Sequence, residues 1–583
     1  MNIRSMAKKI FEVNFFFSTI LVPAIALTLY CGSFAYISTR LQLEGVNYFF
    51  AIKFGKYMVF ITMVAVVALL VILFLGKDRL IFKKSSEKFF FGDLLLLLLP
   101  LTPVVQYVLN NQAILSPAES LAIPVLFVLY SCLYIFTIPA LAGIFMPKRT
   151  LMAVGLAFIF TIANMASISH SYNWFEIGKL RIQLLFFGVS FFSTWLLYNL
   201  DARRFLHVFI LLNFVINSSM QILTQGGASD ASPLPVEGNK LLSFLENKTP
   251  VITPNIYLLL YDAYVPNETM LGYGIDNSAQ EDYLSTQGFE LYPHTYSIGS
   301  STLATMSRVL NVSAEYYAGH NRIEVSGDGI TQKILKSFGY KTYGLFPYDY
   351  MFRGYGSRYD YSFPASSTPP YITLLKAIFM GEFRFDIEKV GFSDQPREKF
   401  VETKQRIFKN ISENKVFIYM HSDLPSHTQN SGVCLPNETD QFKARLTAAN
   451  AEMRQDLKLI VENDPGAIVI VAGDHGPHLT KNCTSLTDVY DISKISRLDI
   501  QDRYGSFLAI RWPTGDFLEY DDIVVLQDLF PAVFAYLYKD KTILNSRIEP
   551  KIPIPNTISG ASVNNGYIFG GINDGELLFL SGK

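Results

Sequence analysis

Charged residues are scarce in this chain, and neither sign is in excess. Of the 583 residues only 17% are charged, and the formal net charge is −1. A nucleic-acid-binding surface needs clustered positive charge, which this composition does not supply. We therefore expect no nucleic-acid partner.

Cysteine is rarer still, and the four cysteines form no cluster that could hold a structural zinc ion. Cys31 and Cys132 lie inside apolar runs and are interpreted as small buried hydrophobic side chains. Cys434 and Cys483 lie in the more polar second half. A disulfide between these two is expected in an oxidising compartment, and two free thiols are the alternative.

What the chain has in abundance is apolar sequence, and most of it precedes residue 223. Runs such as Met63–Gly76 and Leu94–Pro100 lack the polar stripe that a core helix of a soluble protein carries. A membrane-crossing helix needs about 20 apolar residues. Residues 1–223 are thus predicted to be a polytopic helical membrane domain with a retained first span. The seven predicted spans are 11–36, 57–76, 91–109, 119–146, 151–169, 181–199 and 205–223.

The Lys and Arg residues of alternate loops predict the orientation of these spans. One side holds Arg4, Lys8, Lys9, Lys77, Arg79, Lys83, Lys84, Lys88, Lys148, Arg149, Arg203 and Arg204. The other side holds only Arg40, Lys53, Lys56, Lys179 and Arg181. The richer side is expected to be cytoplasmic, so an odd number of spans places the rest of the chain outside. We expect a multi-pass protein of the inner (plasma) membrane, with a periplasmic or extracellular domain.

Charge within the spans is too sparse for a transport pathway. Asp93 and Glu119 lie at span ends, and the sequence shows no proton relay or ion path of the kind that a transporter needs.

The sequence changes character after residue 223. Residues 224–253 are rich in Gly, Ser and Pro and predict a linker with one short helix at Lys240–Glu246. Continuous apolar strands then alternate with helical patterns, as in PNIYLLLYD, KVFIYMH, AIVIVAGDHG and FLAIRWP. This alternation predicts that 254–583 is an α/β domain with a mostly parallel sheet covered by helices on both faces.

Polar residues end three of the expected strands: Asp262, His421 and the pair Asp474–His475. The carboxyl ends of parallel strands are where such sheets collect their chemistry. In GDHG, an acid and an imidazole flanked by glycines could bind a divalent cation, although a surface turn uses the same residues. Asp262 would be costly at the end of a buried strand without a partner or a cation.

A candidate nucleophile lies in TYSIGSSTLATMSRVLN, where a Gly-Ser-Ser-Thr turn leads into a helix. A hydroxyl there would lie beside backbone N–H groups that favour a phosphate or sulfate, and a metal ion could activate it. Spacing alone favours simple helix capping. In HSDLPSH, His421 and His427 could contact the transferred group or protonate a leaving oxygen, or be structural.

Taken in order, these motifs resemble the alkaline-phosphatase/sulfatase superfamily, over about Thr253–Leu537. The similar branch holds membrane-anchored, sulfatase-like phosphoethanolamine and phosphoglycerol transferases. The resemblance implies Asp262, Asp474 and His475 as metal ligands and His427 as a substrate-binding residue. It also implies Thr302 as the nucleophile and a further metal ligand, with Ser300, Ser301 and Thr305 as alternatives.

The sequence departs from the common sulfatase pattern in two places. No C/S-x-P-x-R motif is present, and Ala263 follows Asp262 where a second aspartate is usual. Both departures favour a threonine-type transferase over sulfate-ester hydrolysis. In place of the Arg-His pair of phosphoethanolamine transferases the chain has Arg503 and Tyr504. His478 could substitute for that histidine or be a loop residue.

The resemblance implies a metal-dependent transfer of phosphoethanolamine or phosphoglycerol from a phospholipid to a cell-envelope glycan or lipid. Two carboxylates, an imidazole and a hydroxyl suit Zn²⁺ or Mn²⁺ better than Mg²⁺ or Ca²⁺. One alternative is a sulfatase-like hydrolase of sulfate or phosphate esters. Another is a non-catalytic factor in the assembly of envelope polysaccharide.

Overall fold

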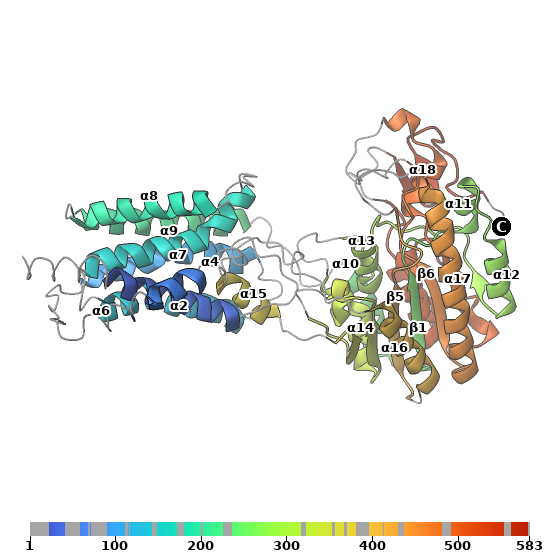
Figure 1. The fold of residues 1–583 in the computed structure, drawn as a ribbon. Coiled ribbons are helices and arrows are strands. Elements are labelled where there is room, and N and C mark those ends of the chain that lie inside the picture. Colours follow the sequence, from blue (N-terminus) through green and yellow to red (C-terminus); the bar gives the residue numbers. More distant parts are fainter. Residues whose placement is uncertain are drawn as a thin grey trace, which may run out of the picture. The chain divides into compact units, whose positions relative to one another are not determined.

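The computed structural model divides the chain into two compact units. The first is Met1–Asp230 with Thr368–Gly391, and the second is Ala231–Ser367 with Phe392–Lys583 (Figure 1). The residues described are 22–40, 59–67, 70, 90–110, 115, 117–142, 148–171, 180–199, 202–225, 236–315, 322–352, 356–365, 370–379, 396–411, 413–428, 437–480, 491–552 and 561–580.

The described part of the first unit is helical, because its apolar runs satisfy their backbone groups within each helix. Two stretches, Phe91–Leu109 and Pro117–Leu141, are long and apolar enough to cross a bilayer. The other predicted crossings, and the orientation, stay predictions. The helices are α2 (Val22–Arg40), η2 (Phe91–Leu97), α4 (Leu98–Asn110), α5 (Pro117–Cys132), η4 (Leu133–Thr137), α6 (Ile138–Ala142), α7 (Lys148–Ser171), α8 (Leu180–Asn199), α9 (Arg203–Gln225) and α15 (Pro370–Phe379).

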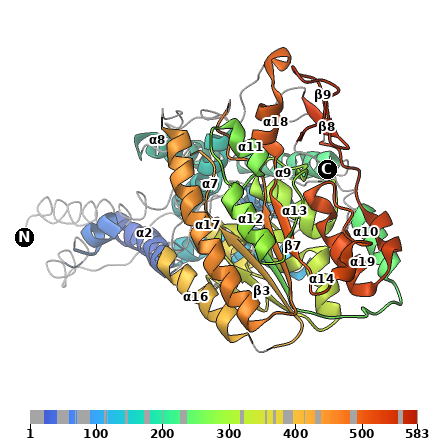
Figure 2. The ribbon, with the colours of Figure 1, turned by 90° about the vertical axis from the view of Figure 1, so that its right-hand side faces the viewer.

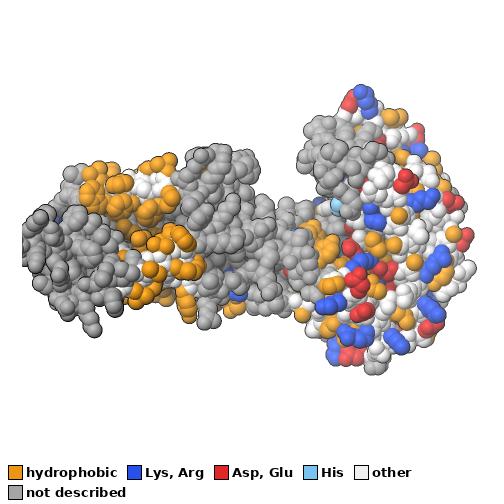
Figure 3. Space-filling view, viewed as in Figure 1, with side chains coloured by type: hydrophobic (Ala, Val, Ile, Leu, Met, Phe, Trp, Pro, Cys, Tyr) orange, Lys and Arg blue, Asp and Glu red, His pale blue; other side chains and the backbone are white. Residues whose placement is uncertain are grey.

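Apolar side chains cover much of the described surface of this unit (Figure 3). Phe192 on α8 and Phe209 on α9 are 63% and 54% exposed. An apolar surface of this extent indicates contact with a membrane or a partner. Asp93 is buried at the start of η2, where it accepts a hydrogen bond from Tyr198 and pairs with His207. This acid is thus satisfied inside the unit, at the span end where the sequence predicts it.

The second unit is built on one seven-stranded sheet in its described residues, with strand order β2-β7-β6-β1-β5-β3-β4. Strands β6, β1, β5, β3 and β4 run parallel, and β7 is antiparallel to β6 and to β2. The strands are β1 (Ile256–Tyr261), β2 (Glu290–Leu291), β3 (Lys341–Leu345), β4 (Tyr361–Phe363), β5 (Val416–Ser422), β6 (Ile468–Gly473) and β7 (Leu508–Arg511). The predicted α/β class is confirmed, and FLAIRWP forms the antiparallel strand.

Helices cover both faces of this sheet, which is why its strands are apolar throughout. Alternate residues of β1 enter two separate cores: Leu258 packs on one face and Leu259 on the other. Figure 2 shows α16 and α17 on one side and α13, α14 and α19 on the other. The helices are α10 (Val236–Leu245), α11 (Asn267–Gly272), α12 (Ser278–Thr286), α13 (Thr302–Asn311), η6 (Glu324–Asp328), α14 (Ile330–Ser337), η7 (Asp349–Met351), α16 (Arg397–Asn410), α17 (Glu438–Asn463), η9 (Ile492–Lys494), α18 (Arg497–Tyr504), η10 (Gly515–Phe517), η11 (Leu526–Asp528), α19 (Leu529–Tyr538) and η12 (Lys541–Ser546).

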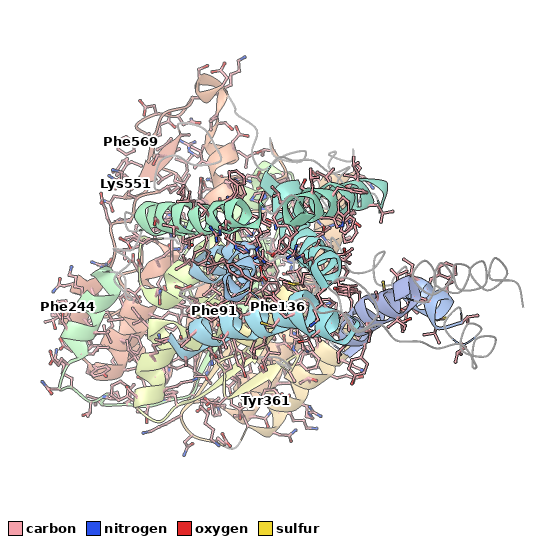
Figure 4. All side chains as sticks on the ribbon, turned by 90° about the vertical axis from the view of Figure 1, so that its left-hand side faces the viewer. Phe91, Phe136, Phe244, Tyr361, Lys551 and Phe569 are labelled. Atoms are coloured by element: carbon pink, nitrogen blue, oxygen red, sulfur yellow. The ribbon has the colours of Figure 1, made fainter. Side chains whose placement is uncertain are left out.

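The edges of the second unit are formed by short elements. Tyr361 lies on the edge strand β4, and a separate hairpin of β8 (Ser562–Asn564) and β9 (Tyr567–Phe569) carries Phe569 (Figure 4). The short helix expected at Lys240–Glu246 is part of α10, which begins one turn earlier and carries Phe244 (Figure 4).

Two of the four cysteines lie within the described residues. Cys31 is buried, Cys132 is partly buried, and both are free thiols. Cys434 and Cys483 lie outside the described residues, so their disulfide stays a prediction.

A buried ion network ties α16 to α17. Lys404 and Asp456 pair with no exposure of either side chain, and Lys404 also contacts Glu452 at 2.6 Å. Arg397 bridges Glu452 at 2.5 Å and pairs with Asp423, just beyond β5. Three carboxylates thus face two cations beside the carboxyl end of β5, and burial raises the pKa of Asp423 and that of Asp456, the latter to about 6.

Candidate metal centre

Three ligand-type side chains gather where β1 and β6 end. Tyr261, the last residue of β1, is in register with Gly473, the last residue of β6. The residues that follow, Asp262 and Asp474, therefore leave the same edge of the sheet side by side. One ligand atom from each of Asp262, Asp474 and His475 lies within 4.8 Å of the others. This cluster is the size of a single cation site.

Neither glycine of the GDHG motif has room for a side chain. A Cβ atom on Gly473 would lie 1.8 Å from the carbonyl oxygen of Tyr264, and one on Gly476 would lie 1.9 Å from that of Asp502. Real Cβ atoms do not approach backbone so closely. The motif therefore allows the Asp-His pair to lie against neighbouring backbone on both sides.

Asp474 is fully buried and held as a carboxylate. Its Oδ1 accepts hydrogen bonds from the backbone N–H groups of Ala263 and His475, both at 3.0 Å. Ala263 has a left-handed φ of 59°, uncommon for a residue other than glycine, which aims its N–H at Asp474. Burial opposes ionisation, but His475, His421 and these hydrogen bonds hold the pKa of Asp474 below its ordinary value.

The other oxygen of Asp474 shows that a cation fits. Oδ2 is buried with no hydrogen-bond donor among the described residues, and it lies 3.4 Å from Nε2 of His475. A buried carboxylate oxygen without a donor is costly unless a cation faces it. Mixed oxygen and nitrogen ligands suit Zn²⁺ or Mn²⁺.

Thr302 is the hydroxyl residue beside this cluster. Its Oγ1 lies 3.4 Å from Asp262 Oδ1 and 3.5 Å from His475 Nε2. It is the first residue of α13, where backbone N–H groups lack partners within the helix. The hydroxyl is thus placed between ligand atoms and an anion-favouring helix terminus.

The other three hydroxyl residues are placed differently. Ser301 is the N-cap of α13, is exposed, and makes no side-chain capping bond within the described residues. Thr305 is fully buried and shares a 2.9 Å hydrogen bond with Ser297. The backbone of Ser300 is hydrogen-bonded with His478. Of these candidates, Thr302 has its hydroxyl at the carboxylate–imidazole cluster.

Three imidazoles meet beside the cluster. The ring of His475 lies 6.2 Å from that of His427 and 5.3 Å from that of His478, and the latter two are 5.8 Å apart. Nδ1 of His475 contacts the carbonyl oxygen of Gly476 at 2.8 Å, so a proton on Nδ1 leaves Nε2 with a lone pair toward the carboxylates. Nδ1 of His427 makes the same contact with Thr428, also at 2.8 Å.

His478 and His421 are the more enclosed histidines. Burial, with the charge of Arg503 and the neighbouring imidazoles, lowers the pKa of His478 well below its usual value. His421 ends β5 in a buried position, and its Nδ1 lies 3.2 Å from the hydroxyl of Tyr419. Burial lowers its pKa as well, which favours the neutral imidazole. Arg503 and Tyr504, in place of an Arg-His pair, are both buried at the end of α18.

A cleft of about 220 Å³ opens beside the cluster. Asp262, Thr302, His421 and His427 line one part of it, and all four were named from the sequence. The remaining lining residues are Phe346, Pro347, Tyr348, Tyr350, Met351 and Asp423.

None of these six lining residues, the second wall of the cleft, was predicted from the sequence, although a signal was present. Phe346–Met351 follow β3, which is parallel to β5, so the rule for strand ends also applies to KTYGLFPYDY. Asp423 follows His421 by two residues and could have been found in the same way.

The far end of α13 is held by a buried acid, which gives a testable pH dependence. Glu324 accepts a 2.9 Å hydrogen bond from Asn311, the last residue of α13, and burial raises the pKa of Glu324 to about 7. An unfolded chain releases this proton near 4.5. Between those values the folded state binds the extra proton, so stability falls as pH rises through this window, by about 3 kcal/mol.

The substitution Glu324→Gln should remove this contribution and keep the contact with Asn311. The thermal unfolding midpoint of the full chain in detergent, measured at pH 5 and pH 8, should fall less for Glu324→Gln than for the unaltered protein. An equal fall in both proteins would show that Glu324 is ionised in the fold.

The fold and the cluster together define a class: an α/β domain with a candidate metal centre at the carboxyl edge of its parallel strands, in one chain with an apolar helical unit. No protein-family model matches this chain, and no curated protein matches it. Solved structures are similar to it in fold.

One similar structure is the C-terminal periplasmic domain of EcEptC from Escherichia coli, with 12% identity over 50% of this chain and 83% of that chain and a TM-score of 0.33. Another is the integral membrane protein lipooligosaccharide phosphoethanolamine transferase A (EptA) from Neisseria meningitidis, with 12% identity, 90% and 94% coverage and a TM-score of 0.29. A third is the lipoteichoic acid synthase LtaP from Listeria monocytogenes, with 14% identity, 56% and 83% coverage and a TM-score of 0.32.

Proposed function

We propose that this protein is a membrane-bound, metal-dependent transferase of the alkaline-phosphatase/sulfatase superfamily. It moves a phospho-substituted head group from a phospholipid to a cell-envelope glycan or lipid through Thr302. The observation that carries the proposal is the position of the Thr302 hydroxyl, 3.4 Å from Asp262 and 3.5 Å from His475 at a helix N-terminus.

Asp262, Asp474, His475 and Thr302 would hold a divalent cation, with Zn²⁺ or Mn²⁺ preferred for this ligand set. When bound, the ion lowers the pKa of the Thr302 hydroxyl and neutralises charge on the transferred group. The backbone N–H groups at the start of α13 add hydrogen bonds to the phosphoryl oxygens.

The reaction proceeds in two steps. Oγ1 of Thr302 attacks phosphorus, a phospho-threonine bond forms, and the bond from phosphorus to the diacylglycerol oxygen breaks. His427, which lines the same cleft, takes up the hydroxyl proton and gives it to the leaving oxygen. An acceptor hydroxyl then attacks phosphorus, the bond from phosphorus to Oγ1 of Thr302 breaks, and the proton of the acceptor hydroxyl passes through His427 to Oγ1.

The second wall of the cleft favours a cationic head group. Tyr348 and Tyr350 bring aromatic rings to this wall, the guanidinium of Arg322 lies over the ring of Tyr350, and Asp423 brings a carboxylate paired with Arg397. Aromatic faces and a negative charge attract an ammonium group and give a neutral glycerol no equivalent gain. Phosphoethanolamine is therefore the proposed group, ahead of phosphoglycerol.

The apolar first unit is consistent with a donor that lies in the bilayer. The apolar helices, and the excess of Lys and Arg in alternate loops, support a second unit on the outer side of the membrane. We assign the protein to the inner membrane with a periplasmic or extracellular catalytic domain.

Product analysis tests this function. The full-length protein in vesicles is given head-group-labelled phosphatidylethanolamine or phosphatidylglycerol together with envelope glycolipid. Metal-dependent transfer of label to the glycolipid, faster from phosphatidylethanolamine, is the expected result. Release of free head group would show a hydrolase instead, and a metal-free protein without turnover would show a non-catalytic assembly factor.

A further inference from the structure

One short helix of the C-terminal half of the chain belongs to the first unit. The chain leaves the second unit after Ser367, contributes Thr368–Gly391 to the helical unit, and returns at Phe392. The described part of this insertion is α15, with the sequence PYITLLKAIF and Lys376 as its one charged residue. An apolar stretch of about this length is too short to span a bilayer and is found in buried core helices and in re-entrant or interfacial membrane segments.

The contacts of α15 lie on α5. The ring of Phe379 lies 4.9 Å from that of Tyr130, edge to face, and 6.4 Å from that of Phe127. Phe127 is fully buried, whereas Leu121 and Leu129 on the same helix are 69% and 62% exposed. Helix α5 therefore has a covered aromatic side that packs against α15 and an open aliphatic side that suits lipid.

This aromatic contact continues into the interior of the helical unit. The rings that extend it come from α2, η4 and α7: Tyr30, Phe34, Tyr134 and Phe158. A Cβ on Gly155 of α7 would lie 2.0 Å from the carbonyl oxygen of Tyr134, so these helices approach as closely as small residues permit. Phe379 thus joins a packed cluster.

The position of Phe127 along α5 indicates how deep in the bilayer its contact with α15 lies. Phe127 follows Pro117, the first residue of α5, by about 15 Å of helix, since each residue rises 1.5 Å. This is about half of a bilayer core of roughly 30 Å. The distribution of Lys and Arg predicts that the start of α5 lies at the outer face of the membrane, the side also predicted for residues 254–583.

We propose that α15 is a re-entrant helix by which the outer catalytic unit enters the outer half of the bilayer and draws on a membrane-borne donor. The insertion lies between β4 and α16, and Arg397 at the start of α16 pairs with Asp423 of the cleft. Its role with a lipid donor rests on the proposed function, whereas its location does not.

Cross-linking tests the location. In a full-length background with Cys31→Ala and Cys132→Ala, the pair Phe379→Cys and Tyr130→Cys should be joined in membranes by a short bifunctional maleimide. The matched pair Phe379→Cys and Leu129→Cys should not, because Leu129 lies on the open side of the helix. Equal linking of both pairs, or of neither, would overturn the proposal.

Activity tests the role. Phe379→Ala should lower the rate with phosphatidylethanolamine in vesicles by about tenfold or more, because a buried aromatic contact is lost. The rate with soluble 4-nitrophenyl phosphoethanolamine should stay within about twofold, since the cleft residues are unchanged. The control Phe209→Ala, on the open surface of α9, should leave both rates unchanged.

The two ideas fail in different ways. A Phe379→Ala protein that loses both rates equally, or neither, contradicts the role of α15. An unaltered protein that cross-links as expected but transfers no head group contradicts the proposed function and leaves the location of α15 supported.

Discussion

Replacement of Thr302 by alanine is expected to lower the rate of head-group transfer by about 10⁴-fold or more, because without the hydroxyl no covalent intermediate can form. Intact-mass analysis of the unaltered full-length protein mixed with donor and no acceptor should show one added phospho-substituted head group. The same measurement on Thr302→Ala should show none.

The conservative variant Thr302→Ser serves as the control. It keeps the hydroxyl 3.4 Å from Asp262 with one methyl group fewer, so it should retain the adduct and lose about tenfold in rate. An adduct that persists in Thr302→Ala would move the nucleophile to a neighbouring hydroxyl, with Ser300 and Ser301 the first to be tested.

Asp474→Asn is expected to empty the metal centre. The carboxylate is fully buried and contributes a negative charge that the isosteric amide lacks, so the affinity for a divalent cation should fall steeply. Metal analysis of the purified full chain should give about one ion for the unaltered protein and much less for the variant. Transfer should fall by about 10³-fold or more, in line with the loss of a charge-stabilising group.

Thermal unfolding provides a second readout for this variant. A cation that binds only the folded state stabilises it by about 2.7 kcal/mol at 100 times its dissociation constant. Added Zn²⁺ or Mn²⁺ should therefore raise the unfolding midpoint of the metal-stripped protein and leave that of Asp474→Asn unchanged.

The matched control is Asp464→Asn, the same chemical change at the amino end of β6. Asp464 accepts hydrogen bonds from Asn255 and Tyr257, away from the metal cluster, and its replacement should keep the ion and the metal-induced shift. Full metal content in Asp474→Asn would refute the proposed ligand set.

The local sequence pattern was enough to predict the fold class and the central strands of the second unit. Continuous apolar strands must be covered on both faces, so PNIYLLLYD and AIVIVAGDHG already indicated buried strands of one sheet, although not that they are neighbours. Asp262 and Asp474 follow those strands directly, and side chains that follow parallel strands must share one edge. That is why these two acids could be placed together before any coordinates.

The antiparallel direction of β7 and the second wall of the cleft could not be predicted from the local sequence pattern. The apolar pattern of FLAIRWP is compatible with a parallel or an antiparallel strand, and only its pairing with β6 shows that the strand is antiparallel. Asp423 and Tyr350 line the same cleft as Thr302 because separate strands lie side by side in the sheet, and no short window of sequence records this.

By itself the sequence determined the apolar helical half, the α/β class and the order of the motifs, because periodicity and hydropathy act over a few turns of chain. Only the tertiary structure decided which hydroxyl meets the carboxylates. Ser300, Ser301, Thr302 and Thr305 are equivalent in composition, and the closure of α13 onto the sheet edge brings Thr302 to the cluster. The same holds for α15, which packs against α5, a helix more than 200 residues earlier in the chain. Contacts between distant segments depend on the whole packed core, and a local pattern cannot specify them.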